Sequence, residues 1–131
     1  MATPTPEDLR ATDLFSGLTD ADLAELAAWF EVQDVSADAV LAREGASGYA
    51  FMILGTASAV VLHGDAVVRH LNPGDFFGEA AILGRGRRTA TVKATGAGTV
   101  WVLFGTRFRE MGIRFPEQHA AVERVLAQRV D

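Results

Sequence analysis

Short β-prone segments separated by turn residues dominate the middle of this 131-residue chain. Strands this short and this evenly spaced are typical of a sandwich or barrel, because tight turns join each strand to the next. Gly64-Asp65 is a fair hairpin turn between the last two. The first five expected strands span residues 31–35, 39–43, 49–54, 57–62 and 66–71.

Helical patterns are predicted at both ends of the chain. Thr5 and Thr19 are each expected to cap a helix, because their hydroxyl groups can accept a hydrogen bond from an N–H group in the first turn. The second helix places four apolar residues on one face, namely Leu23, Leu26, Ala27 and Phe30. That face requires a partner, either the outside of the following sheet or the C-terminal helix.

The remaining segments complete the expected fold. Two more strands are predicted at 88–95 and 99–104, and helices around 106–111 and from Pro116 to about Val130. We therefore expect a mainly β domain with flanking helices, a double-stranded β-helix of the jelly-roll type. The whole chain, 1–131, is expected to be one domain, with N-terminal helices in 1–30, the β-roll in 31–104 and C-terminal helices in 105–131.

The chemically most suggestive stretch lies between residues 73 and 92. Pro73-Gly74-Asp75 predicts a turn, because proline fixes φ and glycine tolerates positive φ. From Gly78 to Leu83 the residues fit one or two turns of helix that begin at a glycine. The free N–H groups of a helix N-terminus favour a phosphate, and a glycine there lets the phosphate approach the backbone.

Two charged residues of the same stretch have complementary roles towards such a ligand. The guanidinium group of Arg88 can hold two phosphate oxygens in a planar fork. The carboxylate of Glu79 would be repelled by phosphate, so we expect it to bind a neutral hydroxyl donor of the same ligand, such as a ribose 2′-hydroxyl. The alternative is a structural ion pair between the two, which is a poor source of stability when buried.

Two runs of residues resemble the phosphate-binding cassette of cyclic nucleotide-binding domains. The first is Phe77-Gly78-Glu79, with Ala81, and the second runs from Arg88 to Val92 and begins ten residues after the glycine. The resemblance implies that Glu79 binds the ribose 2′-hydroxyl group and that Arg88 pairs with the cyclic phosphate. It also implies that backbone N–H groups around Gly78, Glu79 and Ala80 complete the phosphate site, and that Thr89 contacts phosphate or base.

This sequence departs from the family pattern at two positions. Ala80 stands where many members have a larger apolar residue, and Arg87 stands where many have proline. Neither change removes a group that contacts the ligand. Arg85 and Arg87 are interpreted as solvated loop charges that flank the pocket and can raise its potential. The candidate ligand-binding residues are Phe77, Gly78, Glu79, Ala80, Ala81, Arg87, Arg88, Thr89 and Ala90.

Catalytic and metal chemistry find little support in the sequence. A cupin-type metal enzyme would need a closely spaced histidine pair, whereas His63 and His70 are seven residues apart and His119 is remote. The chain contains no cysteine and no G-x-S-x-G motif. We therefore expect a protein that is not an enzyme and has no cofactor beyond its nucleotide ligand.

Charge and hydropathy limit the partners. The net charge of −5 and the sequence pI of about 5.1 have the wrong sign for a protein that mainly binds nucleic acid. No apolar run approaches the length of a membrane span, and the first residues lack the features of a signal peptide. We expect a cytoplasmic protein that acts without nucleic acid or membrane.

The functional hypothesis is a sensor of a 3′,5′-cyclic purine nucleotide. The first choice is cAMP, and cGMP stays open, because in this family a hydroxyl residue after the arginine, here Thr89, can bond guanine. The apolar stripe of Val122, Val125 and Leu126 is either core or part of a lid over the purine. Output is expected through an unidentified protein partner or a homodimer. The alternative is a ligand-free module of the same fold that serves protein–protein contact.

Overall fold

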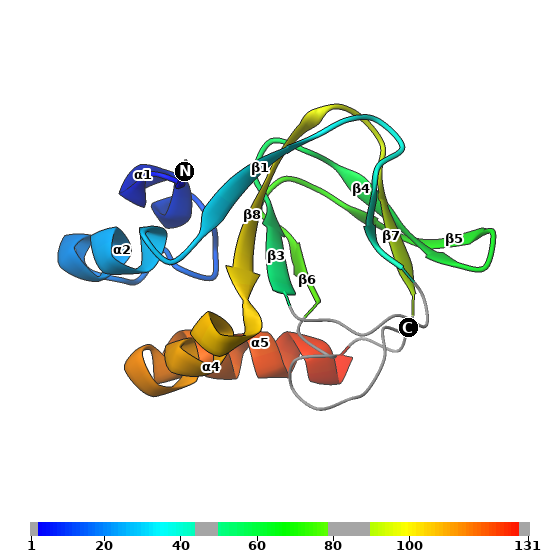
Figure 1. Ribbon diagram of the computed structural model, residues 1–131. Coiled ribbons are helices and arrows are strands. Elements are labelled where there is room, and N and C mark those ends of the chain that lie inside the picture. The colour runs from blue at the N-terminus through cyan, green and yellow to red at the C-terminus, as the bar shows by residue number, and fades with distance from the viewer. Residues whose placement is uncertain (1–2, 44–49, 79–89, 129–131) are drawn as a thin grey trace.

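A computed structural model describes residues 3–43, 50–78 and 90–128 of the chain. They form a β-roll of two four-stranded antiparallel sheets with helices at one side (Figure 1). Sheet A has the strand order β1-β8-β3-β6, and sheet B has the order β2-β7-β4-β5. The strands are β1 (Glu31–Val35), β2 (Val40–Ala42), β3 (Ala50–Leu54), β4 (Ala59–His63), β5 (Ala66–Leu71), β6 (Phe76–Phe77), β7 (Thr91–Ala94) and β8 (Gly98–Phe104). This arrangement confirms the predicted fold class.

The N-terminal helices begin where the sequence predicts. In α1 (Pro6–Arg10), the Thr5 hydroxyl accepts a hydrogen bond from the Asp8 N–H group, and the Asp8 carboxylate accepts one from the Thr5 N–H group. This reciprocal pair is a capping box. In α2 (Asp20–Ala27), the hydroxyl group of Thr19 accepts from the N–H group of Asp22. The C-terminal helices are α4 (Gly105–Arg114) and α5 (Pro116–Gln128).

Two of the differences between the predicted and the observed strands have a clear physical reason. The short strand β6 was missed, because two residues directly after a turn show no periodicity; its pairing with Met52 and Ile53 of β3 is a tertiary contact. The strand predicted from residue 57 begins at Ala59. The N–H groups of Gly55, Thr56 and Ala57 all point to the carbonyl oxygen of Thr99, which holds these residues in a turn rather than in the β4 ladder.

Sheet A separates two hydrophobic cores. Because side chains alternate along a strand, β8 directs Trp101 and Leu103 toward the helices, and Val100 and Val102 toward sheet B. The first core, between the helices and sheet A, also contains the predicted face of α2, with Leu23, Leu26, Ala27 and Phe30 all buried. The predicted partner was the sheet or the C-terminal helix, and the structure supplies both.

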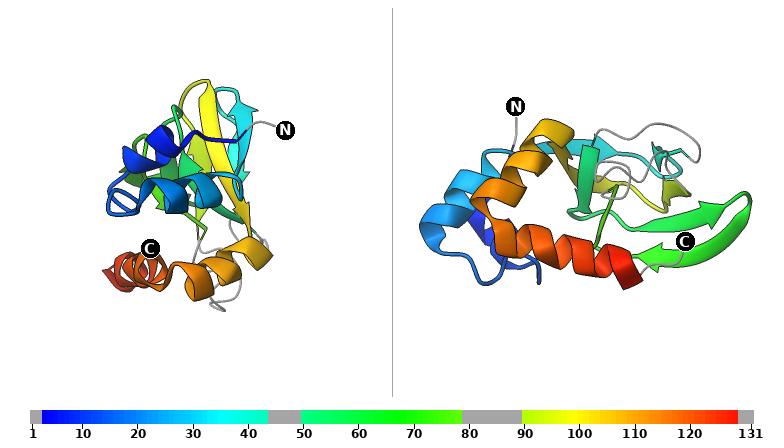
Figure 2. Two further views of the ribbon diagram at one scale, coloured as in Figure 1. Left: turned by 90° about the vertical axis from the view of Figure 1, so that its left-hand side faces the viewer. Right: turned by 90° about the horizontal axis from the view of Figure 1, so that it is seen from below.

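The helices of the two chain ends contact each other beside this core (Figure 2). Arg114, at the end of α4, forms ion pairs with Asp22 at 3.1 Å and Glu25 at 3.0 Å, both on α2. The hydrogen bond and the charge of Glu25 raise the pKa of the Arg114 guanidinium group. Trp29 packs edge-on against Phe115, with ring centroids 5.6 Å apart. The N-terminal helices therefore hold the junction between α4 and α5.

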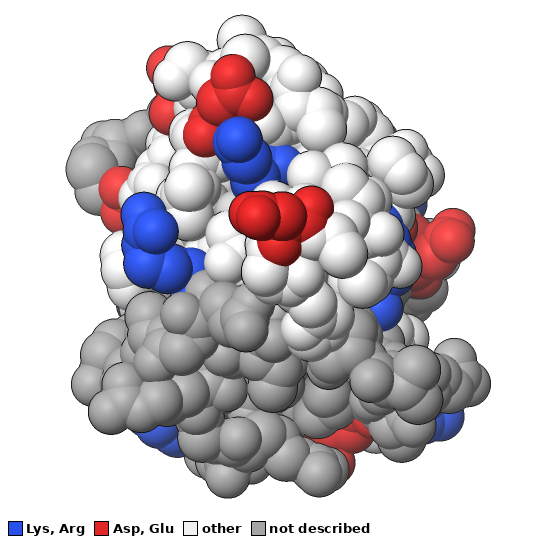
Figure 3. All heavy atoms as spheres, turned by 90° about the vertical axis from the view of Figure 1, so that its right-hand side faces the viewer, with Lys and Arg blue, Asp and Glu red and all other residues white. Residues whose placement is uncertain are grey.

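Among the described residues, no helix combines the length and the apolar character needed to cross a membrane. On the face of the roll formed by sheet B, basic and acidic side chains of the described residues are interspersed (Figure 3).

Candidate functional site

The described residues fix the two ends of the predicted cassette. The chain enters it from β6, an edge strand of sheet A, and leaves it into β7, an inner strand of sheet B. The cassette therefore connects the two sheets. Glu79, Ala80, Ala81, Arg87, Arg88 and Thr89 lie outside the described residues, as do Arg85 and the short helix predicted up to Leu83. Their roles stay predictions.

The turn before the cassette is fastened to β3. The N–H group of Gly74 donates to the carbonyl oxygen of Leu54 at 2.7 Å, and the N–H group of Leu54 donates to the carbonyl oxygen of Asp75 at 2.9 Å. The Asp75 carboxylate accepts from the N–H group of Asn72 at 2.8 Å. Gly74 has a φ of 93°, which glycine adopts without steric cost. The predicted turn therefore exists and places β6 beside β3.

Phe77 and Gly78 form the entry to the cassette. Phe77 pairs with Met52 of β3 and is only 4% exposed, so its ring belongs to the core between the sheets rather than to a ligand surface. Gly78 has a φ of 95°. From the sequence, the expected role of this glycine is to let a phosphate approach the backbone closely. The backbone conformation gives a second reason for a glycine at this position, because residues with a Cβ atom rarely adopt a positive φ.

Ala90 marks the exit from the cassette. It is half-buried and packs against the core between the two sheets, next to β7. Both flanks of the cassette are thus packed against the same core, through Phe77 on one side and Ala90 on the other.

The apolar stripe of α5 divides between two environments. Val122 is fully buried in the core between the helices and sheet A, which agrees with the core interpretation. Val125 is half-buried and lines a cavity. The side chain of Leu126 lies outside the described residues, and a lid function of α5 stays a prediction.

The histidines occupy different elements. His63 and His70 lie on β4 and β5, whereas His119 lies on α5, where its ring packs 5.0 Å from that of Phe108 and its Nδ1 atom is 2.9 Å from a carboxylate oxygen of Glu123. Within the described ranges, no group of three or more possible metal ligands comes together.

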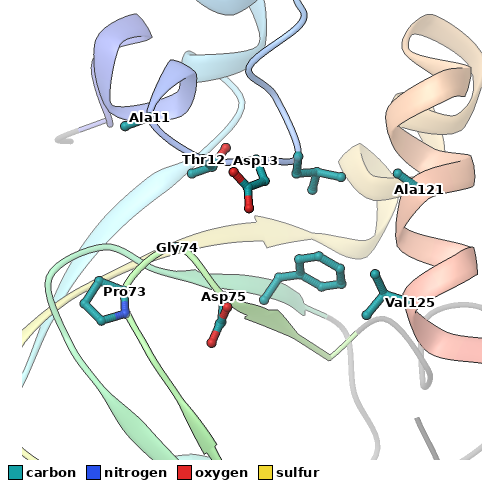
Figure 4. A pocket seen from close by; sticks show the side chains of 10 residues that line it. Ala11, Thr12, Asp13, Pro73, Gly74, Asp75, Ala121 and Val125 are labelled. Carbon is teal, nitrogen blue, oxygen red and sulfur yellow. The ribbon is translucent and has the colours of Figure 1, made fainter. Parts of the chain in front are cut away.

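Sequence reasoning missed the link from Arg114 to Asp22 and Glu25. These residues are 92 and 89 positions apart, and their spacing carries no local signal. It also gave no indication of two adjoining cavities near the N-terminus, lined by described residues. Figure 4 shows the larger one, between the segment Ala11–Leu14, the turn at Pro73–Asp75 and helix α5.

Comparisons with known proteins agree with the family resemblance and with the fold. The family model of the cyclic nucleotide-binding domain matches residues 32–114. The cAMP-dependent protein kinase regulatory subunit of Colletotrichum orbiculare is 36% identical over 89 residues, which are 66% of this chain and 23% of that protein. The cGMP-dependent protein kinase of Toxoplasma gondii is 30% identical over 121 residues, which are 92% of this chain and 12% of that protein.

A solved structure shows the same relationship. The regulatory domain of Toxoplasma gondii PKA, crystallised with cAMP, has a TM-score of 0.69 and 30% identity over 81% of this chain and 42% of that chain. The matched part of this chain spans a quarter or less of the length of each of the two curated relatives named above. Domains of this kind are regulatory rather than catalytic. The matched family model covers more than half of the sequence, and the chain belongs to the cyclic nucleotide-binding domain family.

Proposed function

We propose that this chain is a non-catalytic sensor that binds a 3′,5′-cyclic purine nucleotide, with cAMP as the first choice. The observation that carries the proposal is the intact cassette sequence, with Glu79 and Arg88 both present, in a chain that belongs to this family. The named relatives include a cAMP-dependent kinase subunit and a domain crystallised with cAMP. A cGMP-dependent kinase among the relatives keeps cGMP as the second candidate.

The residue roles follow from the chemistry of the ligand. Arg88 would hold the cyclic phosphate through two charge-assisted hydrogen bonds. Glu79 would accept a hydrogen bond from the ribose 2′-hydroxyl group. The positive φ of Gly78 and its missing Cβ atom support an approach of the phosphate to the backbone N–H groups that follow. Phe77 and Ala90 would anchor the two ends of the cassette rather than contact the ligand.

Output would require two states of the domain that bind the nucleotide with different affinity. Helix α5 is the candidate for the responding element, because it follows α4 directly and shares the core that sheet A forms with the helices. A change in the position of α5 would then be passed to a protein partner or to a second copy of the chain.

Isothermal titration calorimetry of the full chain against cAMP, cGMP and AMP tests the proposal. The expected result is binding of a cyclic nucleotide and not of AMP. As an independent readout, a cyclic nucleotide at about a hundred times its Kd adds about 2.7 kcal/mol of stability. For a domain of this size that raises Tm by roughly 10 °C. No heat and no shift with any of the three ligands at millimolar concentration would contradict the proposal and favour a ligand-free structural module.

A further inference from the structure

Two cavities that share a wall form a continuous groove beside the N-terminal helices. The first has a volume of about 430 Å³ and the second about 350 Å³, within the usual size range of ligand pockets. They share four residues, Ala11, Thr12, Pro73 and Gly74. The groove runs from α5 past the turn before β6 to Trp101 of β8. We call it the N-terminal groove.

The larger cavity combines apolar walls with carboxylates. Its apolar lining comes from Ala11, Leu14, Pro73, Phe76, Ala121 and Val125. Asp13 and Asp75 line the same cavity, and Figure 4 shows the Asp13 carboxylate directed into the space between the N-terminal segment and the turn. Such a surface fits a side chain with an apolar stem and a cationic end.

The charged residues among the described lining of the two cavities are all acidic, and one of them, Glu7, is already paired with Arg10, which is not among the lining residues. Glu7 and Asp8 line the second cavity, whereas no lysine or arginine is among the described residues that line either cavity. The carboxylate of Asp13 has no hydrogen-bond or ion-pair partner within the part of the chain that the structure describes. A cation can therefore approach it without displacing an internal contact, and the net charge of −5 favours the encounter over longer distances.

We propose that the N-terminal groove is a docking site for a basic, amphipathic peptide segment of a protein partner, in which an arginine or lysine flanked by apolar residues enters the cavity beside Asp13. The stem of that side chain packs between the turn before β6 and α5, and its charged end pairs with the Asp13 carboxylate. None of the described residues that line either cavity is a candidate nucleotide-binding residue, so the docking proposal does not rest on the proposed nucleotide function.

Fluorescence anisotropy with labelled synthetic peptides tests the proposal on the full chain. The probe is a peptide of alternating leucine and arginine, and its matched controls replace arginine by neutral citrulline or by glutamate. The arginine peptide is expected to bind, the citrulline peptide more weakly, and the glutamate peptide not at all. Equal binding of the arginine and glutamate peptides, or binding of neither, would overturn the proposal.

Two charge variants separate docking from general attraction to an acidic protein. Asp13→Asn should raise the Kd of the arginine peptide by about two- to fivefold, as expected for the loss of an ion pair at an exposed carboxylate. Asp65→Asn removes the same charge from the turn between β4 and β5, which lines neither cavity. It should leave Kd unchanged at physiological salt, because exposed charges more than about 8 Å away are screened. Equal effects of the two variants would refute a site at Asp13.

A steric variant tests the cavity itself. Ala121→Phe places an uncharged ring in the cavity wall on α5 and should lower the affinity for the arginine peptide. The salt dependence of the remaining binding should stay the same, because no charge is changed. Circular dichroism and Tm establish that the variant is folded. Unchanged affinity in a folded Ala121→Phe chain would overturn the proposal. The proposal would also be overturned if the wild-type chain self-associated and Ala121→Phe abolished that self-association, because the occupant of the groove would then be a second copy of the chain.

Discussion

Gly78 offers a test of the cassette from a residue whose backbone conformation is described. Its φ of 95° lies in a region that alanine reaches only with strain of about 1–2 kcal/mol. Gly78→Ala should therefore lower the free energy of unfolding by about that amount. For a domain of this size, the corresponding fall in Tm is roughly 4–8 °C.

Gly74 provides a matched control. Its φ of 93° is nearly the same, and a Cβ atom added there would meet nothing within 4 Å. Gly74→Ala should thus pay a similar backbone strain without a steric clash, so the two variants should unfold at similar temperatures. Any difference in nucleotide affinity between the two variants then results from where the added methyl group lies and not from a difference in stability.

Calorimetry with cAMP supplies the decisive comparison. In Gly78→Ala, a methyl group would stand where the proposed phosphate approaches the backbone, and the loss of one hydrogen bond to a charged group costs about 1.5–3 kcal/mol. Affinity should fall by about tenfold to a hundredfold. Gly74→Ala should bind as the wild type does. If both variants bound cAMP equally well, the phosphate would not lie against the backbone at Gly78, and that part of the proposal would be wrong.

Three other substitutions extend the test. Arg88→Ala should weaken nucleotide binding at least about thirtyfold in calorimetry, because losing one partner of a desolvated charge pair costs roughly 2–5 kcal/mol. Arg85→Ala is the control, and an equal loss of affinity in both variants would contradict the assignment of Arg88. Glu79→Gln should weaken cAMP binding less than Arg88→Ala does, and should hardly affect a 2′-deoxy ligand; an equal loss for both ligands would remove the ribose role. Leu23→Ala should destabilise the fold by about 2–5 kcal/mol in urea denaturation, because Leu23 is fully buried in the core beside α2; an unchanged midpoint would contradict that packing.

Much of the fold was predictable because its signals are local. Thr5 and Thr19 cap the helices that follow them, and Gly64, with a φ of 59°, makes the hairpin between β4 and β5. The strand β6 was not predictable, since its two residues are defined by their pairing with β3. The division into two cores was not predictable either. Strand β3 is apolar on both faces, and an uninterrupted apolar run does not tell which face meets the helices.

The candidate site was predictable from a long motif and not from geometry. The spacing of Glu79 and Arg88 identified the family, which the comparisons confirm, and the local sequence predicted the turn at Pro73. The positive φ of Gly78 was not foreseen, because glycine fits both a close approach and a left-handed backbone. The groove beside Asp13 was not foreseen either. Its walls come from residues 11–14, residues 73–76 and the two α5 residues Ala121 and Val125, which only the tertiary fold brings together.

Aromatic contacts link the entry of the cassette to α5 through the core that faces the helices. Phe76, the residue before Phe77, packs 5.4 Å from Phe51 of β3; Phe51 stacks at 5.0 Å on Phe108 of α4; and Phe108 lies 5.0 Å from His119 of α5. Because packed side chains resist small deformations, a displacement of β6 must be accommodated along this row or by a shift of α4 and α5. Coupling by such a row requires that α5 have two positions, and that the nucleotide bind more tightly when α5 is in one of them.

A movement of α5 would also change the wall that Ala121 and Val125 form in the N-terminal groove. The proposed nucleotide site and the proposed docking site would therefore be linked through one helix.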